Sequence, residues 1–153
     1  APNLLTQIPQ HRAFQATVQV RLDWKEEGDM AAVGMTGLRY GYLGLKRQKA
    51  ATVLCLYEGQ VEEKEYEGKA AERCLWQHPL KEDRAWLRLM LGEDGIFRFS
   101  WSGDGEDFSP VPGDFPLTKG TWTGAKLCLW SCSRENLPSE GRGIFRAIEI
   151  TSV

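Results

Sequence analysis

The sequence lacks both an excess of positive charge and any long apolar run. Its 153 residues carry 19 Lys and Arg against 21 Asp and Glu, which gives a formal net charge of -2. Nucleic-acid-binding domains normally carry a basic surface, so no nucleic-acid partner is expected. No stretch approaches the roughly 18 apolar residues that a membrane-spanning helix needs. The longest candidate, residues 85–91, is interrupted by Arg88, so no membrane partner is expected.

Cysteine and histidine are also scarce, with four and two residues respectively. The cysteines form no Cys-x-x-Cys pair and no histidine cluster accompanies them, so neither zinc nor a disulfide scaffold is expected. Cys128 and Cys132 should share one strand, roughly 13 Å apart and too distant to bond. Cys55 and Cys74 can pair if their strands are neighbours. Four reduced, buried thiols are the simpler expectation.

The first residues are not expected to form a signal peptide. Ala1 is followed by Pro2 and Asn3, with neither a basic region nor the apolar segment of a signal peptide. We therefore expect a single domain over residues 1–153, cut from a longer protein. Its cellular compartment and oligomeric state are not predicted.

An alternation of apolar and polar residues is the main pattern that is present. Between Phe14 and Leu22, every second residue is apolar, which is typical of a strand with one buried face. Strands of this kind are expected at residues 14–22, 33–38, 40–46, 52–57, 61–66, 86–91, 96–101, 126–132 and 144–151. Residues 62–73 have a helical composition but are interrupted by Gly68, and we interpret them as a hairpin or ragged loop. Short strands joined by Gly and Pro turns predict an all-β antiparallel sandwich or jelly roll.

Groups that could break bonds are few. His11 and His78 have no nucleophile motif beside them and are interpreted as ordinary loop histidines. Residues 102–107, around Asp104, resemble half of a calcium loop but lack its bidentate glutamate, so a plain turn is favoured over a calcium site. We therefore expect no catalytic residue, no metal ligand and no cofactor in this chain.

Aromatic and arginine residues are the better guide to function. Aromatic rings stack on the apolar faces of sugars, and arginine can hydrogen-bond the hydroxyl groups. Trp86, Arg88 and Arg98 fall opposite the core-facing residues of two adjacent expected strands, and Tyr40 and Tyr42 share a face of another. These five residues are candidates for carbohydrate binding. The alternative is that the six tryptophans fill the core.

Several stretches together resemble a known family. They are residues 27–35 (E-G-D-M-A-A-V-G-M), 39–45 (R-Y-G-Y-L-G-L), 97–108 (F-R-F-S-W-S-G-D-G-E-D-F) and 120–127 (G-T-W-T-G-A-K-L). In this order they resemble the C-terminal β-sandwich module of glycoside hydrolase family 43, the β-xylosidase and α-arabinofuranosidase group. The resemblance implies a concanavalin A-like jelly roll. It also implies a partner, a five-bladed catalytic propeller in the same parent chain, whose sugar pocket the loop 119–123 with Trp122 helps to close.

The sequence also departs from the family pattern. An A-D-F-D-like run in the last strand reads Gly143-Ile144-Phe145-Arg146 here, so both acidic positions are lost. A D-Y-A-Y-like run begins with Arg39 instead of its acid. Any calcium or polar contact made by those acids in relatives is therefore in doubt, and a changed ligand surface is expected.

These observations predict a non-catalytic accessory or carbohydrate-binding module of a glycosidase that degrades plant polysaccharides. Its ligand would be a xylan-type oligo- or polysaccharide, or it would complete the pocket of the propeller. Two alternatives remain open. An exposed apolar patch would favour a purely structural packing domain. Two carboxylates about 5 to 10 Å apart in a groove would favour a stand-alone, lectin-like hydrolase or lyase.

Overall fold

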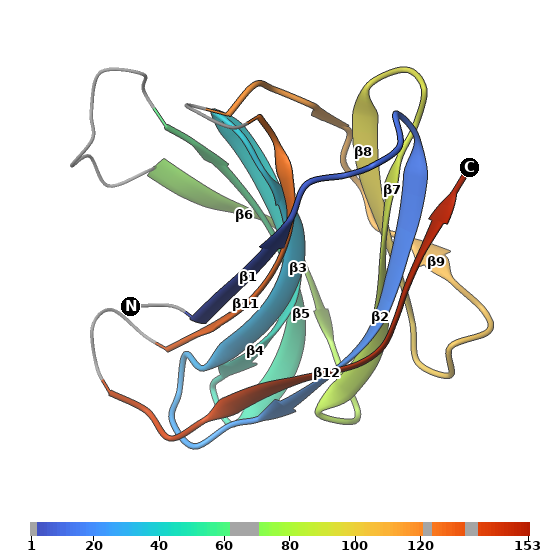
Figure 1. The fold of residues 1–153 in the computed structure, drawn as a ribbon. Coiled ribbons are helices and arrows are strands. Elements are labelled where there is room, and N and C mark those ends of the chain that lie inside the picture. Colours follow the sequence, from blue (N-terminus) through green and yellow to red (C-terminus); the bar gives the residue numbers. More distant parts are fainter. Residues whose placement is uncertain (1–2, 62–70, 121–123, 134–137) are drawn as a thin grey trace.

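Strands make up the regular structure of the chain, as a computed structural model shows for residues 3–61, 71–120, 124–133 and 138–153 (Figure 1). In chain order they are β1 (Asn3–Gln7), β2 (Phe14–Asp23), β3 (Met30–Thr36), β4 (Arg39–Gln48), β5 (Ala51–Gln60), β6 (Ala71–Pro79), β7 (Arg84–Leu91), β8 (Ile96–Ser102), β9 (Ser109–Pro110), β10 (Phe115–Pro116), β11 (Lys126–Cys132) and β12 (Arg142–Ser152). No helix within these ranges is long and apolar enough to cross a bilayer.

The strands form two antiparallel sheets that lie face to face (Figure 1). Sheet A has the order β1-β11-β3-β4-β5-β6. Sheet B has the order β10-β8-β7-β2-β12, and the short β9 pairs with β8. The expected all-β antiparallel sandwich is therefore confirmed.

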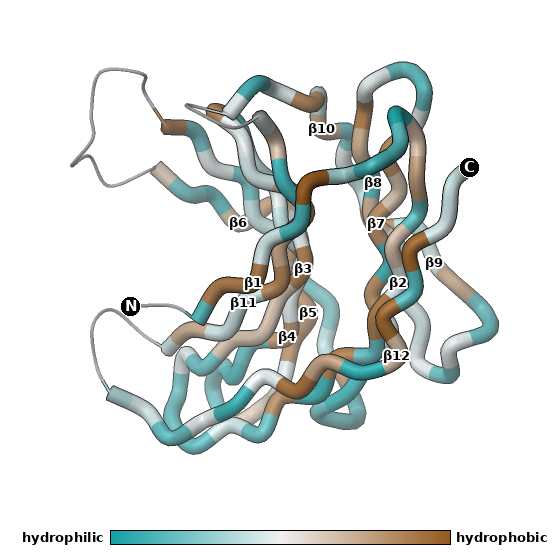
Figure 2. Tube along the Cα trace, in the orientation of Figure 1, coloured by the Kyte–Doolittle hydropathy of each residue, from teal (hydrophilic) through white to brown (hydrophobic). Residues whose placement is uncertain are grey.

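The core lies between the two sheets because apolar residues alternate with polar ones along the strands (Figure 2). In β2, residues from Phe14 to Leu22 are buried at every second position. In β7, Leu87 and Leu89 are buried in the same way, and they face Leu43 and Leu45 of sheet A within one apolar cluster. The inward faces predicted for residues 14–22 and 86–91 are confirmed.

Two strands differ from the sequence prediction. The strand expected at residues 61–66 falls almost entirely on residues 62–70, which lie outside the described ranges, and the described strand that pairs with β5 beside β4 is β6. β6 is a sheet edge with mostly exposed residues and an irregular register beside Leu56, so it lacks a clear alternation. β1, another edge strand, was not predicted because all of its residues are exposed.

The tryptophans within the described ranges do not fill the centre of the core. Trp24, Trp76 and Trp101 are half-buried and pack against its margin. His78 lies in β6 and not in a loop, which corrects the sequence interpretation. Its ring stacks on Trp76 with 5.8 Å between centroids and lies 4.9 Å from Trp101.

Candidate functional site

The outer face of sheet A carries a second cluster of aromatic residues, separate from the core. On β4, Leu43 and Leu45 point inward, so Tyr40 and Tyr42 point outward as the sequence predicts. Tyr57 of β5 and Trp130 of β11 join them on this surface. We call the surface formed by Tyr40, Tyr42, Tyr57 and Trp130 the tyrosine face.

Tyr42 lies at the centre of the tyrosine face. Its ring centroid is 5.1 Å from that of Tyr57, 6.3 Å from that of Tyr40 and 4.6 Å from that of Trp130. The two tyrosine neighbours are nearly parallel to Tyr42, and Trp130 meets it edge-on. Tyr42 is only 7% exposed, whereas the other three are half-buried. Tyr42 therefore supports three rings that remain accessible to a ligand.

A carboxylate from β6 joins the first two phenols. Tyr40 donates a hydrogen bond of 2.8 Å to Glu72 Oε1, and Tyr42 donates one of 2.7 Å to Glu72 Oε2. Burial, followed by the neighbouring Glu72, raises the pKa of both tyrosines above the usual value. Both phenols therefore keep their protons at neutral pH and remain donors to Glu72.

Gly59 makes this arrangement possible. β5 lies between β4 and β6, and Gly59 is opposite Tyr40 on one side and Glu72 on the other. A Cβ atom at Gly59 would lie in the space that the far end of the Tyr40 ring occupies. The absence of a side chain therefore lets the Tyr40 ring cross β5 and reach Glu72.

A cation lies on the same face. Lys46 Nζ donates a hydrogen bond of 2.9 Å to the Tyr57 hydroxyl oxygen and lies 5.3 Å from its ring centroid. Burial lowers the pKa of Lys46, but the hydrogen bond with Tyr57, together with the charge interactions with Tyr57, Cys55 and Cys74, outweighs burial, so the pKa is raised overall. The tyrosine face thus combines apolar rings with one fixed anion and one fixed cation.

The thiols are unpaired. Cys55 and Cys74 lie on neighbouring strands, yet both are free, as are Cys128 and Cys132. Cys55 and Cys128 are buried as expected, but Cys74 is exposed and Cys132 is only half-buried, which corrects that part of the prediction. Burial raises the pKa of the Cys55 thiol to about 12. Cys128 and Cys132 share β11, as predicted.

The other candidate residues lie on the outer face of sheet B. Arg98 is paired with Asp94 at 3.1 Å and with Asp114 at 2.9 Å. The guanidinium of Arg88 lies 3.5 Å above the Phe108 ring, and its Nε donates to Thr17. Both arginines are therefore already engaged within the chain.

Trp86 completes this second group, with the Arg84 guanidinium 5.5 Å from its ring and the loop at Gly105 packed closely over it. Tyr40 and Tyr42 lie on the opposite side of the sandwich from Trp86. The five described candidates therefore form two separate surfaces and not one site. Trp122 lies outside the described residues.

The loop around Asp104 is closed by its own hydrogen bonds. Asp104 Oδ1 accepts bonds from the Ser102 hydroxyl and from the backbone N–H groups of Glu106 and Asp107, at 2.7, 2.9 and 3.0 Å. These contacts hold its pKa near 2. Within the described ranges, no three His, Cys, Asp or Glu residues group closely enough to hold a metal ion.

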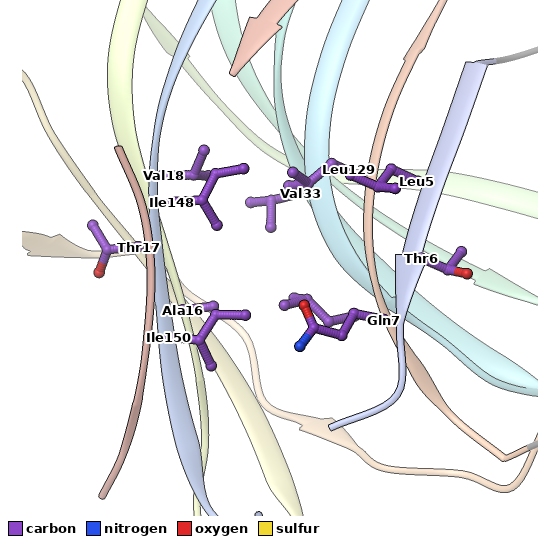
Figure 3. Close-up of a pocket in the computed structure, with 11 residues that line it drawn as sticks. Leu5, Thr6, Gln7, Ala16, Thr17, Val18, Val33, Leu129, Ile148 and Ile150 are labelled. Carbon is purple, nitrogen blue, oxygen red and sulfur yellow. The ribbon is translucent and has the colours of Figure 1, made fainter. Parts of the chain in front are cut away.

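An apolar cavity of about 200 Å³ opens between the sheets, where β1 and β11 face β2 and β12 (Figure 3). Leu5 and Leu129 line one side, and Ile148 and Ile150 line the other (Figure 3). Leu5 is 65% exposed and Ile148 49% exposed. We call this feature the apolar edge groove; its lining offers few polar groups to a sugar.

The sequence did not point to two residues of the tyrosine face or to the glutamate that binds its tyrosines. Tyr57 and Trp130 each alternate with inward leucines, and that alternation was the available signal. Glu72 gave no signal, because it falls within the stretch interpreted as a hairpin or ragged loop.

Comparison with known proteins identifies the fold family. The family described as "Beta xylosidase C-terminal Concanavalin A-like domain" matches residues 1–145. No curated protein matches the chain significantly.

Solved structures agree with that family. A bifunctional GH43-CE protein of Bacteroides eggerthii has a TM-score of 0.80 at 16% identity, over 99% of this chain and 19% of its own. An engineered GH43 enzyme with endo-xylanase and exo-arabinofuranosidase activity has a TM-score of 0.86 at 15% identity, over 99% and 31%. Xylan β-1,4-xylosidase of Bacillus halodurans has a TM-score of 0.75 at 12% identity, over 99% and 30%.

The chain thus spans less than a third of the length of these enzymes, and identities this low show a shared fold. The family match extends over most of the chain, which confirms both the resemblance and the concanavalin A-like jelly roll. The chain therefore belongs to the family of C-terminal concanavalin A-like domains of β-xylosidase, found in glycoside hydrolase family 43 enzymes.

Proposed function

We propose that this chain is a non-catalytic accessory domain of a family 43 enzyme that degrades plant polysaccharide, and that its tyrosine face contacts a xylan-type saccharide. The supporting observation is the set of accessible rings around Tyr42, with Glu72 and Lys46 fixed beside them. Two structural relatives are described by their action on xylan. The described candidates on sheet B support binding less, because both arginines there already have partners.

The proposed contact is weak, because the site is an open sheet face. Rings bind the C–H faces of a sugar, while the polar groups bind its hydroxyls. We expect a dissociation constant between about 1 μM and 1 mM, or roughly -8 to -4 kcal/mol. In the intact enzyme, Trp122 of the loop 119–123 would also complete the pocket of the catalytic propeller, as the family resemblance implies.

A matched pair of tryptophan substitutions tests which surface binds. Trp130→Ala removes an accessible ring from the tyrosine face, whereas Trp86→Ala removes a half-buried ring from the opposite sheet. Isothermal titration with xylo-oligosaccharides should show affinity reduced about tenfold by Trp130→Ala and little changed by Trp86→Ala. The reverse ranking would assign binding to sheet B. Failure of the unmodified chain to bind any plant glycan would contradict saccharide binding altogether.

The apolar edge groove favours a second role, packing against the catalytic domain. Leu5, Ile148 and Ile150 expose apolar surface around one cavity, a feature typical of a protein contact. We propose that the preceding catalytic domain of the same enzyme covers this groove. This role is compatible with saccharide binding, because the groove and the tyrosine face are different surfaces.

Charged substitutions in the groove test this packing role. In the intact enzyme, Leu5→Lys with Ile148→Lys should lower the melting temperature of the catalytic domain by several degrees, since a charge cannot be buried unpaired in an apolar contact. In the isolated 153-residue chain, the effect should be small, because both side chains are already exposed. Leu75→Lys is the control, since Leu75 is 38% exposed on β6 at the other edge of sheet A. Equal effects of the control and the groove variants in calorimetry would argue against docking.

A further inference from the structure

We propose that Glu72 is the polar anchor of the tyrosine face and binds two adjacent hydroxyl groups of a neutral sugar ring, a vicinal diol. This inference rests on the proposed saccharide contact and assigns its central hydrogen-bonding residue. It concerns a side chain that the sequence did not single out.

The carboxylate is held by both of its oxygens. Tyr40 donates to Oε1 and Tyr42 donates to Oε2, at 2.8 and 2.7 Å. Neither phenol moves freely, because Tyr42 is packed between Tyr57 and Trp130, and the Tyr40 ring lies over Gly59. Glu72 is thereby oriented before any ligand arrives, which lowers the entropy cost of binding.

Acceptor capacity remains after these two bonds. Each carboxylate oxygen can accept two hydrogen bonds, so Glu72 retains one free acceptor position on each oxygen. Glu72 is exposed, and it forms no salt bridge with a cation in the described part of the chain. The free positions are therefore accessible to a ligand, and no Lys or Arg of the described ranges neutralises them.

A ligand at Glu72 must bring donors. The ionised carboxylate can only accept, and the phenolic protons of Tyr40 and Tyr42 are already committed to it. Two adjacent hydroxyls can donate side by side to the two oxygens of one carboxylate. Hydrogen bonds to a charged acceptor are stronger than neutral ones. A ring with free neighbouring hydroxyls therefore fits, and a carboxylate, sulfate or phosphate at this position would meet like charge.

The test compares Glu72→Gln with the unmodified chain in titrations with xylotetraose. Glutamine keeps the shape but replaces one acceptor oxygen with a donor and removes the charge. Its affinity should fall at least about tenfold, the equivalent of roughly 1.4 kcal/mol. Glu93→Gln is the matched control, because Glu93 is an exposed glutamate in the β7–β8 turn; its affinity should not change.

A second ligand separates hydroxyl recognition from an indirect effect on the rings. Xylotetraose with its hydroxyls methylated cannot donate hydrogen bonds to Glu72, so it should bind the unmodified chain weakly. Its affinity for Glu72→Gln should be the same as for the unmodified chain. An equal loss with both ligands would mean that Glu72 only positions the tyrosines, and would overturn the inference. Tight xylotetraose binding by Glu72→Gln would also overturn it, but would leave the proposed function intact. No binding by the unmodified chain would overturn both.

Discussion

Replacing Asp29 with alanine is expected to lower the free energy of unfolding by about 3 kcal/mol. Asp29 is 2% exposed and closes the turn between β2 and β3. Its Oδ2 accepts backbone N–H bonds from Lys25 and Glu26 at 2.8 and 3.0 Å, and a hydroxyl bond from Ser139 at 2.8 Å. Alanine would leave these three donors without their acceptor and would detach the turn from the segment that leads into β12.

The pH dependence of this loss identifies its cause. Burial raises the pKa of Asp29, but hydrogen bonds, chiefly from Lys25, Glu26 and Ser139, together outweigh burial, so the pKa lies below its ordinary value. A carboxyl whose pKa is lowered by folding stabilises the protein above its unfolded pKa, and this contribution is lost as the pH falls through the folded value. The difference in the free energy of unfolding between the unmodified chain and Asp29→Ala should therefore shrink below about pH 4.

Urea unfolding at pH 7 and pH 3 measures the loss of stability in Asp29→Ala and how that loss changes with pH. Asp29→Asn is the useful comparison, because it keeps one oxygen acceptor while removing the titrating group. It should lose less stability than alanine at pH 7, and the difference between the two variants should be the same at pH 3, because neither has a carboxyl at this position. A difference between Asp29→Ala and the unmodified chain that stays constant from pH 7 to pH 3 would contradict the assignment.

Replacing Gly34 with alanine is expected to lower the free energy of unfolding by a similar amount, about 3 kcal/mol. In an ordinary strand, alanine is favoured over glycine by roughly 0.5 to 1 kcal/mol. At Gly34, however, the added Cβ would fall on the carbonyl oxygen of Gly41 and lie 2.7 Å from Tyr42 Cβ. The obstacle is the backbone of β4 in the middle of sheet A, which cannot rotate away as a side chain can.

Thermal or urea unfolding of Gly34→Ala measures the cost. Gly103→Ala is the control, because a Cβ there would meet nothing within 4 Å. Its stability should change by less than about 0.5 kcal/mol. Because Gly34 is paired with Tyr42, the damaged protein should also bind saccharide less well wherever it remains folded. Equal stability of the two variants would show that β3 and β4 separate easily.

The fold was predictable where a strand has one face in the core. Residues 14–22 and 86–91 alternate cleanly, and their inward faces followed from that pattern alone. β6 was not predicted, because an edge strand with an irregular register need not alternate apolar and polar residues. The pairing of β6 with β5 depends on the whole sheet order, which local periodicity does not contain.

The candidate site was predictable in part for the same reason. Tyr40 and Tyr42 share a face because they are two residues apart on one strand. Their partner Glu72 comes from the second strand along the sheet, 30 residues or more away in sequence. Alternation also predicted that Trp86 points outward, but not that its sheet lies on the other side of the molecule.

The strand pairings have a consequence for biosynthesis. Asn3 of β1 is paired with Ser131, and Phe14 of β2 is paired with Ser152, so the first strands made bond to the last. As the ribosome releases the chain, β1 and one side of β2 must wait for partners that are still being translated. Closing loops of this length slows folding, and unpaired strand edges invite aggregation meanwhile. The domain can therefore reach its native state only after β12 has left the ribosome, and chaperones that shield those two early strands should raise its yield.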